Sequence, residues 1–172
     1  AVIDKNRQLI EELTIGENNI CIANYNSSKQ HIISGETNLI HNFIKTAKSN
    51  GIKRIIELNV SGAFHSPLMK NSRIYLDKIV KSTNFNNVKI PIYQNFFPLK
   101  NFTSTKITNN LINQIDNPVR WEEIILNLNK DSFNRFIEVG PKNILTKLNK
   151  DIIPDLESTY IENMNLFTTY ND

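Results

Sequence analysis

The sequence predicts a mixed α/β fold built from two small parts, and three observations support that class. Its 172 residues are enough for one domain or two small subdomains. Hydrophobic residues make up 40% and charged residues 22% of the chain, a balance that is typical of a globular protein. Apolar residues recur at helical spacing in some segments and alternate with polar residues in others, so both helices and strands are expected.

The first part, residues 1–60, predicts the order strand end, helix, strand, strand, helix, strand. Asp4 can cap the first helix, and Gly51 supplies the left-handed residue that ends the second helix. Polar residues 26–28 predict a turn between the middle strands. This order is most of a ferredoxin-like βαββαβ unit, in which the first strand is incomplete. The predicted strands are 1–3, 19–24, 30–34 and 53–60, and the predicted helices are 4–13 and 36–50.

The second part, residues 61–172, alternates helices with two strands, which predicts a parallel sheet with helices on its faces. Pro91 interrupts the first of these strands and favours an edge position for it. Two strands leave the faces and edges of a parallel sheet uncovered, so we expect further strands N-terminal to residue 1. No clear pattern marks residues 151–172. The predicted strands are 88–93 and 133–139, and the predicted helices are 66–82, 106–115, 120–129 and 143–148.

His65 stands at the predicted junction between a strand and the helix 66–82. Ser66 is a good N-cap because its hydroxyl can accept a hydrogen bond from the first turn, and Pro67 suits the first helical position. The positive end of the helix disfavours a second positive charge, which favours the neutral imidazole that a general base needs. The alternative on the residues alone is a capping or packing role. The apolar residues expected to be buried by the helix are Leu68, Met69, Leu76, Ile79 and Val80.

The remaining chemistry-bearing residues argue against several other functions. His31 lies within a predicted strand, and His41 falls off the apolar face of its helix, so no metal-ligand spacing is present and no metal is predicted. Cys21 is the only cysteine, which excludes a disulfide framework, and its apolar neighbours predict a buried structural thiol. The net charge of +3 fits an acidic partner, but no basic run predicts nucleic-acid binding.

The sequence has no apolar stretch of ~18 residues, so no membrane span is expected. The first residue is Ala1 and no signal-like segment follows it, so we interpret the chain as part of a longer polypeptide.

Four stretches together carry a resemblance to a known family. They are Gly-Ala-Phe-His-Ser-Pro-Leu-Met at 62–69, residues 23–30 with Ile-Ser-Gly at 33–35, Asn-Pro-Val-Arg-Trp at 117–121, and Glu-Val-Gly-Pro at 138–141. In this order they resemble segments of malonyl-CoA:acyl carrier protein transacylases. The resemblance covers nearly the whole chain but only the C-terminal part of the family's length. It implies a ferredoxin-like small subdomain at 1–60 and, at 61–172, the C-terminal part of an α/β hydrolase-like large subdomain.

The resemblance implies transfer of a malonyl group from coenzyme A to a serine, and then to the phosphopantetheine thiol of acyl carrier protein. It makes His65 the residue that takes a proton from each attacking group, and it assigns the backbone carbonyl that orients the imidazole to Gln114. The family's nucleophilic serine stands in a glycine-flanked elbow N-terminal to this chain, as does the arginine that holds the malonyl carboxylate. No glycine here stands two residues before a serine, so this chain alone is expected to be inactive.

Three further residues are candidates for substrate binding. Phe64 precedes the histidine, and in related acyltransferases a phenylalanine there accompanies malonyl selection; the alternative is a core role. Asn24 and Asn26 bracket the end of a predicted strand, where asparagine usually serves turn chemistry, but their place in the family implies a position near the cleft between subdomains. No cofactor is expected, because malonyl-CoA and phosphopantetheine are substrates.

Two other functions stay open at this stage. One is the matching part of an acyltransferase domain from a polyketide or fatty acid megasynthase. The other is a non-catalytic module that binds an acidic carrier protein through lysines and arginines. The expected partners are acyl carrier protein, malonyl-CoA and the N-terminal part of the same enzyme, which is expected to be monomeric when complete. A bacterial cytoplasm and a plastid both suit this chemistry.

Overall fold

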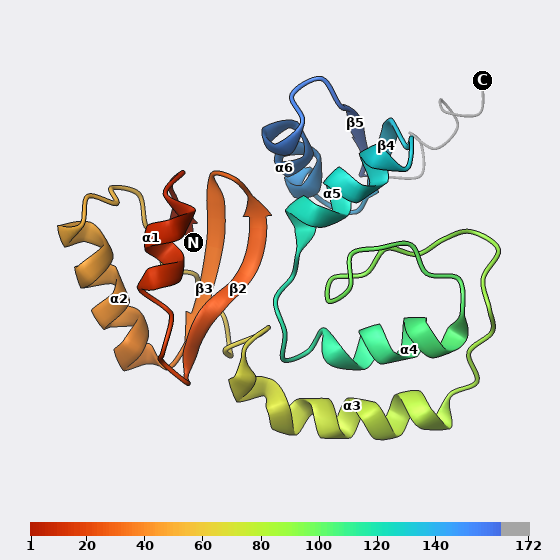
Figure 1. Ribbon diagram of the computed structural model, residues 1–172, viewed down its shortest axis with the longest axis horizontal. Coiled ribbons are helices and arrows are strands. Elements are labelled where there is room, and N and C mark those ends of the chain that lie inside the picture. Colours follow the sequence, from red (N-terminus) through yellow and green to blue (C-terminus); the bar gives the residue numbers. More distant parts are fainter. Residues whose placement is uncertain (163–172) are drawn as a thin grey trace.

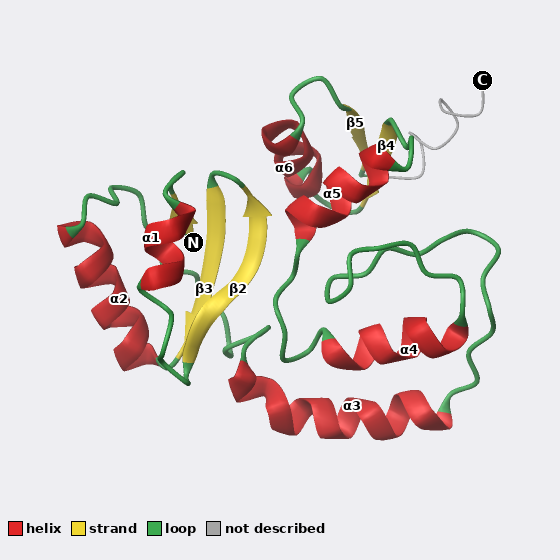
Figure 2. Cartoon of the chain, in the orientation of Figure 1, coloured by secondary structure: helices red, strands yellow, loops and turns green. Residues whose placement is uncertain are grey.

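The structure is a computed structural model that describes residues 1–162. Its N-terminal half is an antiparallel sheet with two helices packed on it (Figures 1 and 2). The strands follow the spatial order β1-β3-β2. The elements are β1 (Val2–Ile3), α1 (Arg7–Glu12), β2 (Ile20–Ser27), β3 (Gln30–Gly35) and α2 (Thr37–Ser49). The predicted order of the first five elements is therefore confirmed.

The core of this half lies between the sheet and the two helices. Gly51, at φ 93°, ends α2 in the left-handed conformation that the sequence predicts, and the chain then turns Ile52 back into the core. The apolar face of α2 contributes Phe43 and Ala47, as its helical spacing indicates. The buried residues of this core are Val2, Ile10, Ile20, Ile22, Phe43, Ala47 and Ile52.

The predicted strand 53–60 is wrong. Ile55 forms an isolated antiparallel bridge with Val2, and Ile56 and Ala1 exchange two backbone hydrogen bonds of 2.6 and 2.8 Å. Beyond that point no strand of the described chain pairs with the segment, because β1 is only two residues long. Apolar alternation alone does not make a strand when its neighbour is missing, and Val60 is consequently 62% exposed.

Two smaller boundaries also differ from the prediction. Asn6, not Asp4, caps α1, since the Asn6 side chain accepts a hydrogen bond from the Leu9 amide. The Asp4 carboxylate instead accepts a 2.8 Å hydrogen bond from the Asn6 amide. β2 extends through Ser27, so the turn between the middle strands lies later than predicted.

The C-terminal half contains two helical layers and a parallel strand pair (Figure 2). The helix α3 packs against α4, while α5 packs against α6, which also covers both strands. Residues Arg135 to Val139 lie opposite Glu157 to Ile161 in parallel register. The elements are the 3₁₀ helix η1 (Pro67–Met69), α3 (Lys70–Ser82), α4 (Ser104–Asn113), α5 (Trp121–Lys130), β4 (Arg135–Val139), α6 (Ile144–Ile152) and β5 (Glu157–Ile161).

A parallel pair is present, but its members differ from those predicted. Residues 88–93 form no strand; they make an isolated bridge between Ile92 and Asn101, near Pro91, which has no N–H to donate. The partner of β4 is β5, which lies within the stretch 151–172 that sequence reasoning left undefined. Residues 163–172 of that stretch lie outside the described part of the chain.

The region after His65 also differs from the prediction. Pro67 occupies the first helical position, but the first turn is 3₁₀, and the Ser66 hydroxyl donates 2.6 Å to the Ala63 carbonyl and caps no amide. Of the residues predicted to be buried by α3, Val80 is buried, whereas Leu68 is 39% and Ile79 is 61% exposed. Leu68 lies in η1, and Ile79 lies on α3, which packs chiefly on α4 within the described structure.

Candidate active site

His65 occupies an unusual backbone position between the two halves. Its φ of 58° places it in the left-handed region, which few residues other than glycine adopt and in which histidine is enriched. Two side chains hold this bend: the buried Ser66 hydroxyl bonds the Ala63 carbonyl, and the Cys21 thiol lies 3.7 Å from the His65 carbonyl oxygen. The bend therefore fixes the direction in which the imidazole leaves the chain.

The imidazole of His65 is oriented by the end of α4. Its Nδ1 lies 2.8 Å from the backbone carbonyl oxygen of Gln114, the residue that ends this helix. A carbonyl oxygen only accepts hydrogen bonds, so Nδ1 carries the proton and Nε2 carries the lone pair of the neutral ring. The contact expected between these two residues is thus present in the structure.

The amide side chain of Gln114 helps to hold the same helix end in place. Its Oε1 accepts a 3.3 Å hydrogen bond from Asn95, and its backbone amide donates 3.0 Å to the Asn110 carbonyl. The carbonyl that faces His65 is therefore attached to a fixed helix end, and not to a loose loop.

A cavity of about 540 Å³ lies beside His65. Phe64, which is 47% exposed, and Asn24 line it together with His65. The rest of the wall comes from β3, from α2, from the segment 55–63, and from Ala1, Val2 and Ala23. These wall residues include Ile32, Ile33, Ser34, Gly35, Ile40, Ile44, Ile56, Leu58 and Val60. The structure therefore brings three of the predicted site residues to one cavity and places the Gln114 carbonyl against the imidazole.

The two asparagines separate in the structure. Both lie inside β2 and do not bracket its end, so that prediction is wrong. Asn24 sits at an irregularity of the β2–β3 ladder and forms a parallel bridge with Val119. Asn26 instead donates 3.3 Å to the Gln30 side chain within the hairpin and lies outside the lining of the cavity. Its side chain is satisfied locally, so the geometry favours the turn-chemistry alternative for Asn26.

Val119 joins the two halves and was not identified from the sequence as a functional residue. Its amide donates 2.8 Å to the Ala23 carbonyl, and its carbonyl accepts 2.9 Å from the Tyr25 amide. These bonds attach the chain between α4 and α5 to β2, next to Asn24. The Asn-Pro-Val-Arg-Trp stretch therefore sets the distance between the Gln114 carbonyl and the sheet. The irregular part of β2 at Asn24 pairs with this distant loop, and such a pairing leaves no signal in the spacing of apolar residues. This explains why Val119 was missed.

Trp121 and Arg120 from the same stretch have structural contacts. The indole N–H of Trp121 donates 3.1 Å to Asn149, whose amide in turn donates 3.1 Å to the Ser158 hydroxyl. Arg120 pairs with Glu123 one helical turn away at 2.8 Å. These contacts connect α5 to α6 and β5 and present no reactive group to the cavity beside His65.

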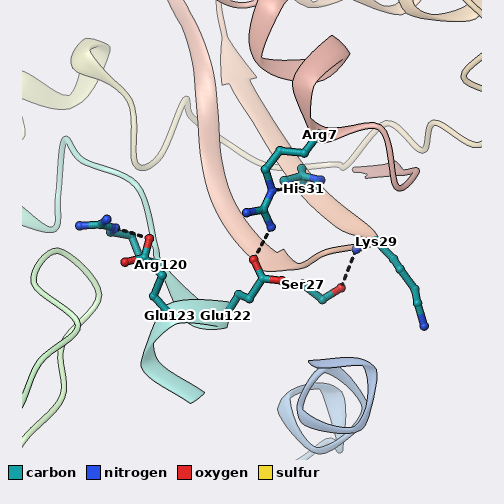
Figure 3. Close-up of polar contacts among 7 residues, drawn as sticks. All are labelled: Arg7, Ser27, Lys29, His31, Arg120, Glu122 and Glu123. Atoms are coloured by element: carbon teal, nitrogen blue, oxygen red, sulfur yellow. Dashed lines mark hydrogen bonds and ion pairs between the residues drawn. The ribbon is translucent and has the colours of Figure 1, made fainter. Parts of the chain in front are cut away.

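A second histidine also lies where the two halves meet, in a very different setting (Figure 3). His31 in β3 is fully buried, and its Nε2 accepts a 3.1 Å hydrogen bond from Arg7 of α1. The Arg7 guanidinium also pairs with Glu122 of α5 and lies 5.6 Å from the centre of the Tyr25 ring. Burial, with the nearby Arg7 charge, lowers the pKa of His31 to about 4. His31 is therefore a neutral structural residue at neutral pH.

His41 is exposed and lies 3.9 Å from Glu57, as expected for a solvated surface histidine. Within residues 1–162, no cluster of three or more histidine, cysteine or acidic side chains has the arrangement of a metal site. None of the helices in this part of the chain combines the length and apolarity needed to cross a membrane.

The relatives found by sequence and by structure belong to the same family. No family model matches the chain. A malonyl CoA-acyl carrier protein transacylase of Bacillus subtilis is 34% identical over 146 residues, which cover 85% of this chain and 46% of the relative. A protein of the same name from Staphylococcus aureus is 30% identical over 169 residues, which cover 98% of this chain and 55% of the relative. The chain thus spans about half the length of the curated relatives it matches.

Solved structures agree with the sequence relatives. The malonyl-CoA:ACP transacylase of Synechocystis superimposes with a TM-score of 0.90 at 27% identity, over 98% of this chain and 56% of that one. A type II PKS acyl-carrier protein in complex with its malonyl-transacylase gives a TM-score of 0.90 at 26% identity, over 98% of this chain and 55% of the matched chain. The chain is therefore homologous to the malonyl-CoA:acyl carrier protein transacylases, a family of fatty acid biosynthesis, over about half of their length.

Proposed function

We propose that this chain supplies the general base of a malonyl-CoA:acyl carrier protein transacylase. The observation that carries the proposal is the 2.8 Å contact between His65 Nδ1 and the Gln114 carbonyl oxygen, in a ring that lines a cavity. This contact orients the ring and leaves Nε2 as the basic nitrogen. An aspartate usually plays the orienting role in serine acyl transfer, and a neutral carbonyl can fix the same tautomer.

In this proposal the nucleophilic serine comes from the part of the enzyme that this chain does not match. His65 Nε2 takes the hydroxyl proton while the serine oxygen attacks the thioester carbonyl of malonyl-CoA, and the coenzyme A sulfur leaves with that proton. The phosphopantetheine thiol of acyl carrier protein then gives its proton to Nε2 and attacks the malonyl-serine ester. The serine oxygen leaves with the second proton, which restores the enzyme.

Phe64 and Asn24 complete the proposed site. The benzyl group of Phe64 lines the cavity next to His65, and it would occupy space that an α-methyl group on the acyl chain requires. One clash of that size discriminates by roughly 1–3 kcal/mol. Asn24 lines the same cavity and is the candidate for a contact with the substrate, while Asn26 is not retained.

We assign residues 1–60 to a ferredoxin-like small subdomain and residues 61–172 to the closing part of an α/β hydrolase-like large subdomain. The strand order β1-β3-β2, with Ile55 bridged to Val2 on the outer side of β1, supports the first assignment. The parallel pair β4–β5 covered by α6 supports the second. The proposed partner is acyl carrier protein, for which the net charge of +3 is suitable. The setting is dissociated fatty acid synthesis in a bacterial cytoplasm or a plastid.

The test is His65→Ala in a transacylase of full family length that contains this chain. We expect the rate of malonyl transfer to acyl carrier protein to fall by about 10²–10⁴-fold, because general acid–base catalysis is lost. His41→Ala, which removes an exposed histidine, is the control and should keep the wild-type rate. Transfer by His65→Ala at a near wild-type rate would show that His65 is not the base.

A further inference from the structure

An ion pair joins the start of α3 to the chain just after α4. The Arg73 guanidinium donates from Nη1 to both carboxylate oxygens of Asp116, at 3.2 and 3.5 Å. Arg73 lies one turn into α3, soon after His65 in the chain, and Asp116 lies directly beyond the end of α4 at Gln114. The two helices pack together, with the first turn of α3 beside the last turn of α4 (Figure 1). The ion pair therefore lies at the same end of the helix pair as the contact between His65 and Gln114.

The Asp116 carboxylate is nearly buried and belongs to the turn that ends α4. Its side chain is 10% exposed, whereas that of Arg73 is 38% exposed. Its Oδ1 also accepts 3.0 Å from the side-chain amide of Asn117, which donates 2.9 Å to the carbonyl of Asn113, the last residue of α4. An ionised carboxylate in such a place is costly without a cationic partner. Arg73 therefore stabilises the closed form of this turn.

The other contacts around His65 and Gln114 each hold one side of their hydrogen bond. Ser66 and Cys21 fix the bend at His65, and Asn95 binds the Gln114 side chain. The chain that connects α3 to α4, residues 83–103, contains no helix or strand. Such an irregular connection does not by itself set the distance between the two helix ends.

The ion pair spans both sides. It closes a short ring that runs from His65 through η1 to Arg73, across to Asp116, and back through Gln114 to the imidazole. The alternative route, through β2 and Val119, contains more residues between the same two points. A short closed path restrains its members more than a long one, because fewer backbone angles can change.

We propose that Arg73 is a positioning residue for the general base, because its ion pair with Asp116 holds the Gln114 carbonyl at hydrogen-bonding distance from His65 Nδ1. This role rests on the function proposed above for His65. Arg73 is not among the residues that line the cavity, so it acts through Gln114 and not on the substrate. Without Arg73 the Asp116 carboxylate keeps only the Asn117 amide, and the turn must open to water, which moves the Gln114 carbonyl away from the imidazole.

The geometry of the pair indicates which substitutions preserve it. Arg73 reaches both oxygens of Asp116 with the single nitrogen Nη1 and does not use the two parallel bonds of a guanidinium fork. One ammonium group on a long stem can make the same contact, so Arg73→Lys should keep the pair. Arg73→Met keeps the apolar stem and removes the charge, so it should lose the pair.

α3 also offers a matched control. Lys81 pairs with Asp77 at 2.7 Å one turn apart on the same helix, so this ion pair joins no second segment to α3. Lys81→Met removes a cation from α3 as Arg73→Met does, but it leaves the link between the two helices intact. A loss of activity that follows from a weaker α3 alone should appear in both variants.

The first measurement is the ¹⁵N spectrum of the histidine rings, in the transacylase of full family length that contains this chain. The bond from Arg7 keeps the lone pair of His31 on Nε2, and the exposed His41 represents a ring in water. At a pH where the rings are neutral, we expect His65 of the wild type to show the proton on Nδ1, as His31 does. In Arg73→Met the His65 shifts should move towards those of His41, while Arg73→Lys and Lys81→Met should match the wild type.

The second measurement is malonyl transfer by the same proteins. We expect kcat of Arg73→Met to fall by about tenfold, with KM for malonyl-CoA changed by less than about twofold, because the base is misaligned while the cavity is kept. Arg73→Lys and Lys81→Met should keep a rate close to the wild type. Asp116→Asn retains the acceptor for Asn117 but loses its charge, so kcat should fall by about threefold, which tests the pair without a stranded carboxylate.

Wild-type ring shifts and wild-type kcat in Arg73→Met and Asp116→Asn would overturn the proposal. So would equal losses in Arg73→Met and Lys81→Met, because a general weakening of α3 would then explain both. The role of His65 is tested separately. If His65→Ala keeps the wild-type rate, the proposed function is wrong whatever the ring shifts show. If His65→Ala loses transfer while Arg73→Met keeps the His65 shifts and kcat, only the positioning role of Arg73 is wrong.

Discussion

His65 and His31 form their hydrogen bonds through different ring nitrogens. His65 donates from Nδ1 to the Gln114 carbonyl and lines a cavity, whereas His31 accepts at Nε2 from Arg7 and is fully buried. The Nδ1 of His31 is buried with no hydrogen-bond partner in residues 1–162. An imidazole that donates to a carbonyl keeps a basic nitrogen for chemistry, whereas one that accepts from a guanidinium uses its lone pair to hold a structure together.

The two histidines also differ in backbone conformation. His31 lies in the middle of a sheet, paired with Val2 on one side and Tyr25 on the other. His65 is a left-handed residue in a bend, fixed by contacts from Ser66 and Cys21. A residue placed in a sparsely populated conformation at a cavity is a better functional candidate than one placed in a regular ladder. Substitutions at the two histidines test this comparison, because they should affect stability to different extents.

The largest expected effect on stability comes from His31→Ala. The substitution leaves a cavity in the core and removes the acceptor of Arg7, so we expect the free energy of unfolding to fall by about 3 kcal/mol in urea titrations. His65→Ala should lower it by less than about 1 kcal/mol, because the residue lines a cavity and is not one of the buried residues. If both substitutions cost the same, the distinction between a structural and a catalytic histidine is not supported.

The second expected effect is on the pH dependence of stability. The pKa of folded His31 is about 4, below the ordinary value of 6.5, so the unfolded chain binds the proton more readily. The stabilisation is therefore complete above pH 6.5 and is lost as the pH falls towards 4. We expect about 2 kcal/mol less stability at pH 4.5 than at pH 7 from this residue. Urea titrations at both pH values measure it, and His31→Phe should remove this part of the change while His41→Ala keeps it.

Much of the fold follows from the sequence, and the exceptions have a common cause. Periodicity and glycine placement located α2 and its end at Gly51, because these depend on residues close in sequence. The segments 53–60 and 88–93 have the composition of strands but form none, since a strand also needs a partner of matching length. β5 was overlooked because its existence depends on pairing with β4, which apolar spacing within residues 157–161 does not reveal.

The candidate site divides in the same way. His65, Phe64 and Asn24 reach one cavity, and the Gln114 carbonyl meets the imidazole, although that carbonyl was assigned only through the family resemblance. Val119 and Cys21 were not recognised as supports of the site. Each acts through contacts with residues far away in the sequence, and no local pattern signals such a contact.

A smaller effect on the pH dependence of stability comes from a carboxylate, Glu138, and it can be distinguished from the titration of His31. Glu138 of β4 accepts hydrogen bonds from the Thr146 and Leu145 amides at 2.7 and 3.1 Å, at the start of α6. Burial raises the pKa of Glu138, but these hydrogen bonds lower it by more, so the pKa of Glu138 lies below its ordinary value. Its stabilisation is therefore present above the ordinary carboxylate pKa and is lost as the pH falls below it.

Glu138→Gln should accordingly cost about 1 kcal/mol at pH 7, as expected for a lost cap at a helix N-terminus. In urea titrations the variant should keep the loss of stability between pH 6.5 and 4.5 and should show a weaker further loss below that range. A variant that instead abolished the change above pH 4.5 would show that His31 is not its source.

The smallest expected effect concerns Cys21, which supports the His65 bend without taking part in chemistry. Burial raises the pKa of the Cys21 thiol to about 11, so very little thiolate is present at neutral pH. We expect alkylation by iodoacetamide at pH 8 to be about 100-fold slower for the folded chain than for the urea-unfolded chain, which follows from a difference of about two pKa units.

Cys21→Ala removes the weak donor to the His65 carbonyl and should lower the free energy of unfolding by only about 0.5–1 kcal/mol. Cys21→Ser restores a donor at the same place and serves as the control, so the ¹⁵N chemical shifts of the His65 ring should match the wild type in Cys21→Ser and move in Cys21→Ala. Rapid alkylation of the folded chain would contradict the structural role. Ring shifts that stay the same in both variants would show that the bend holds His65 without the thiol.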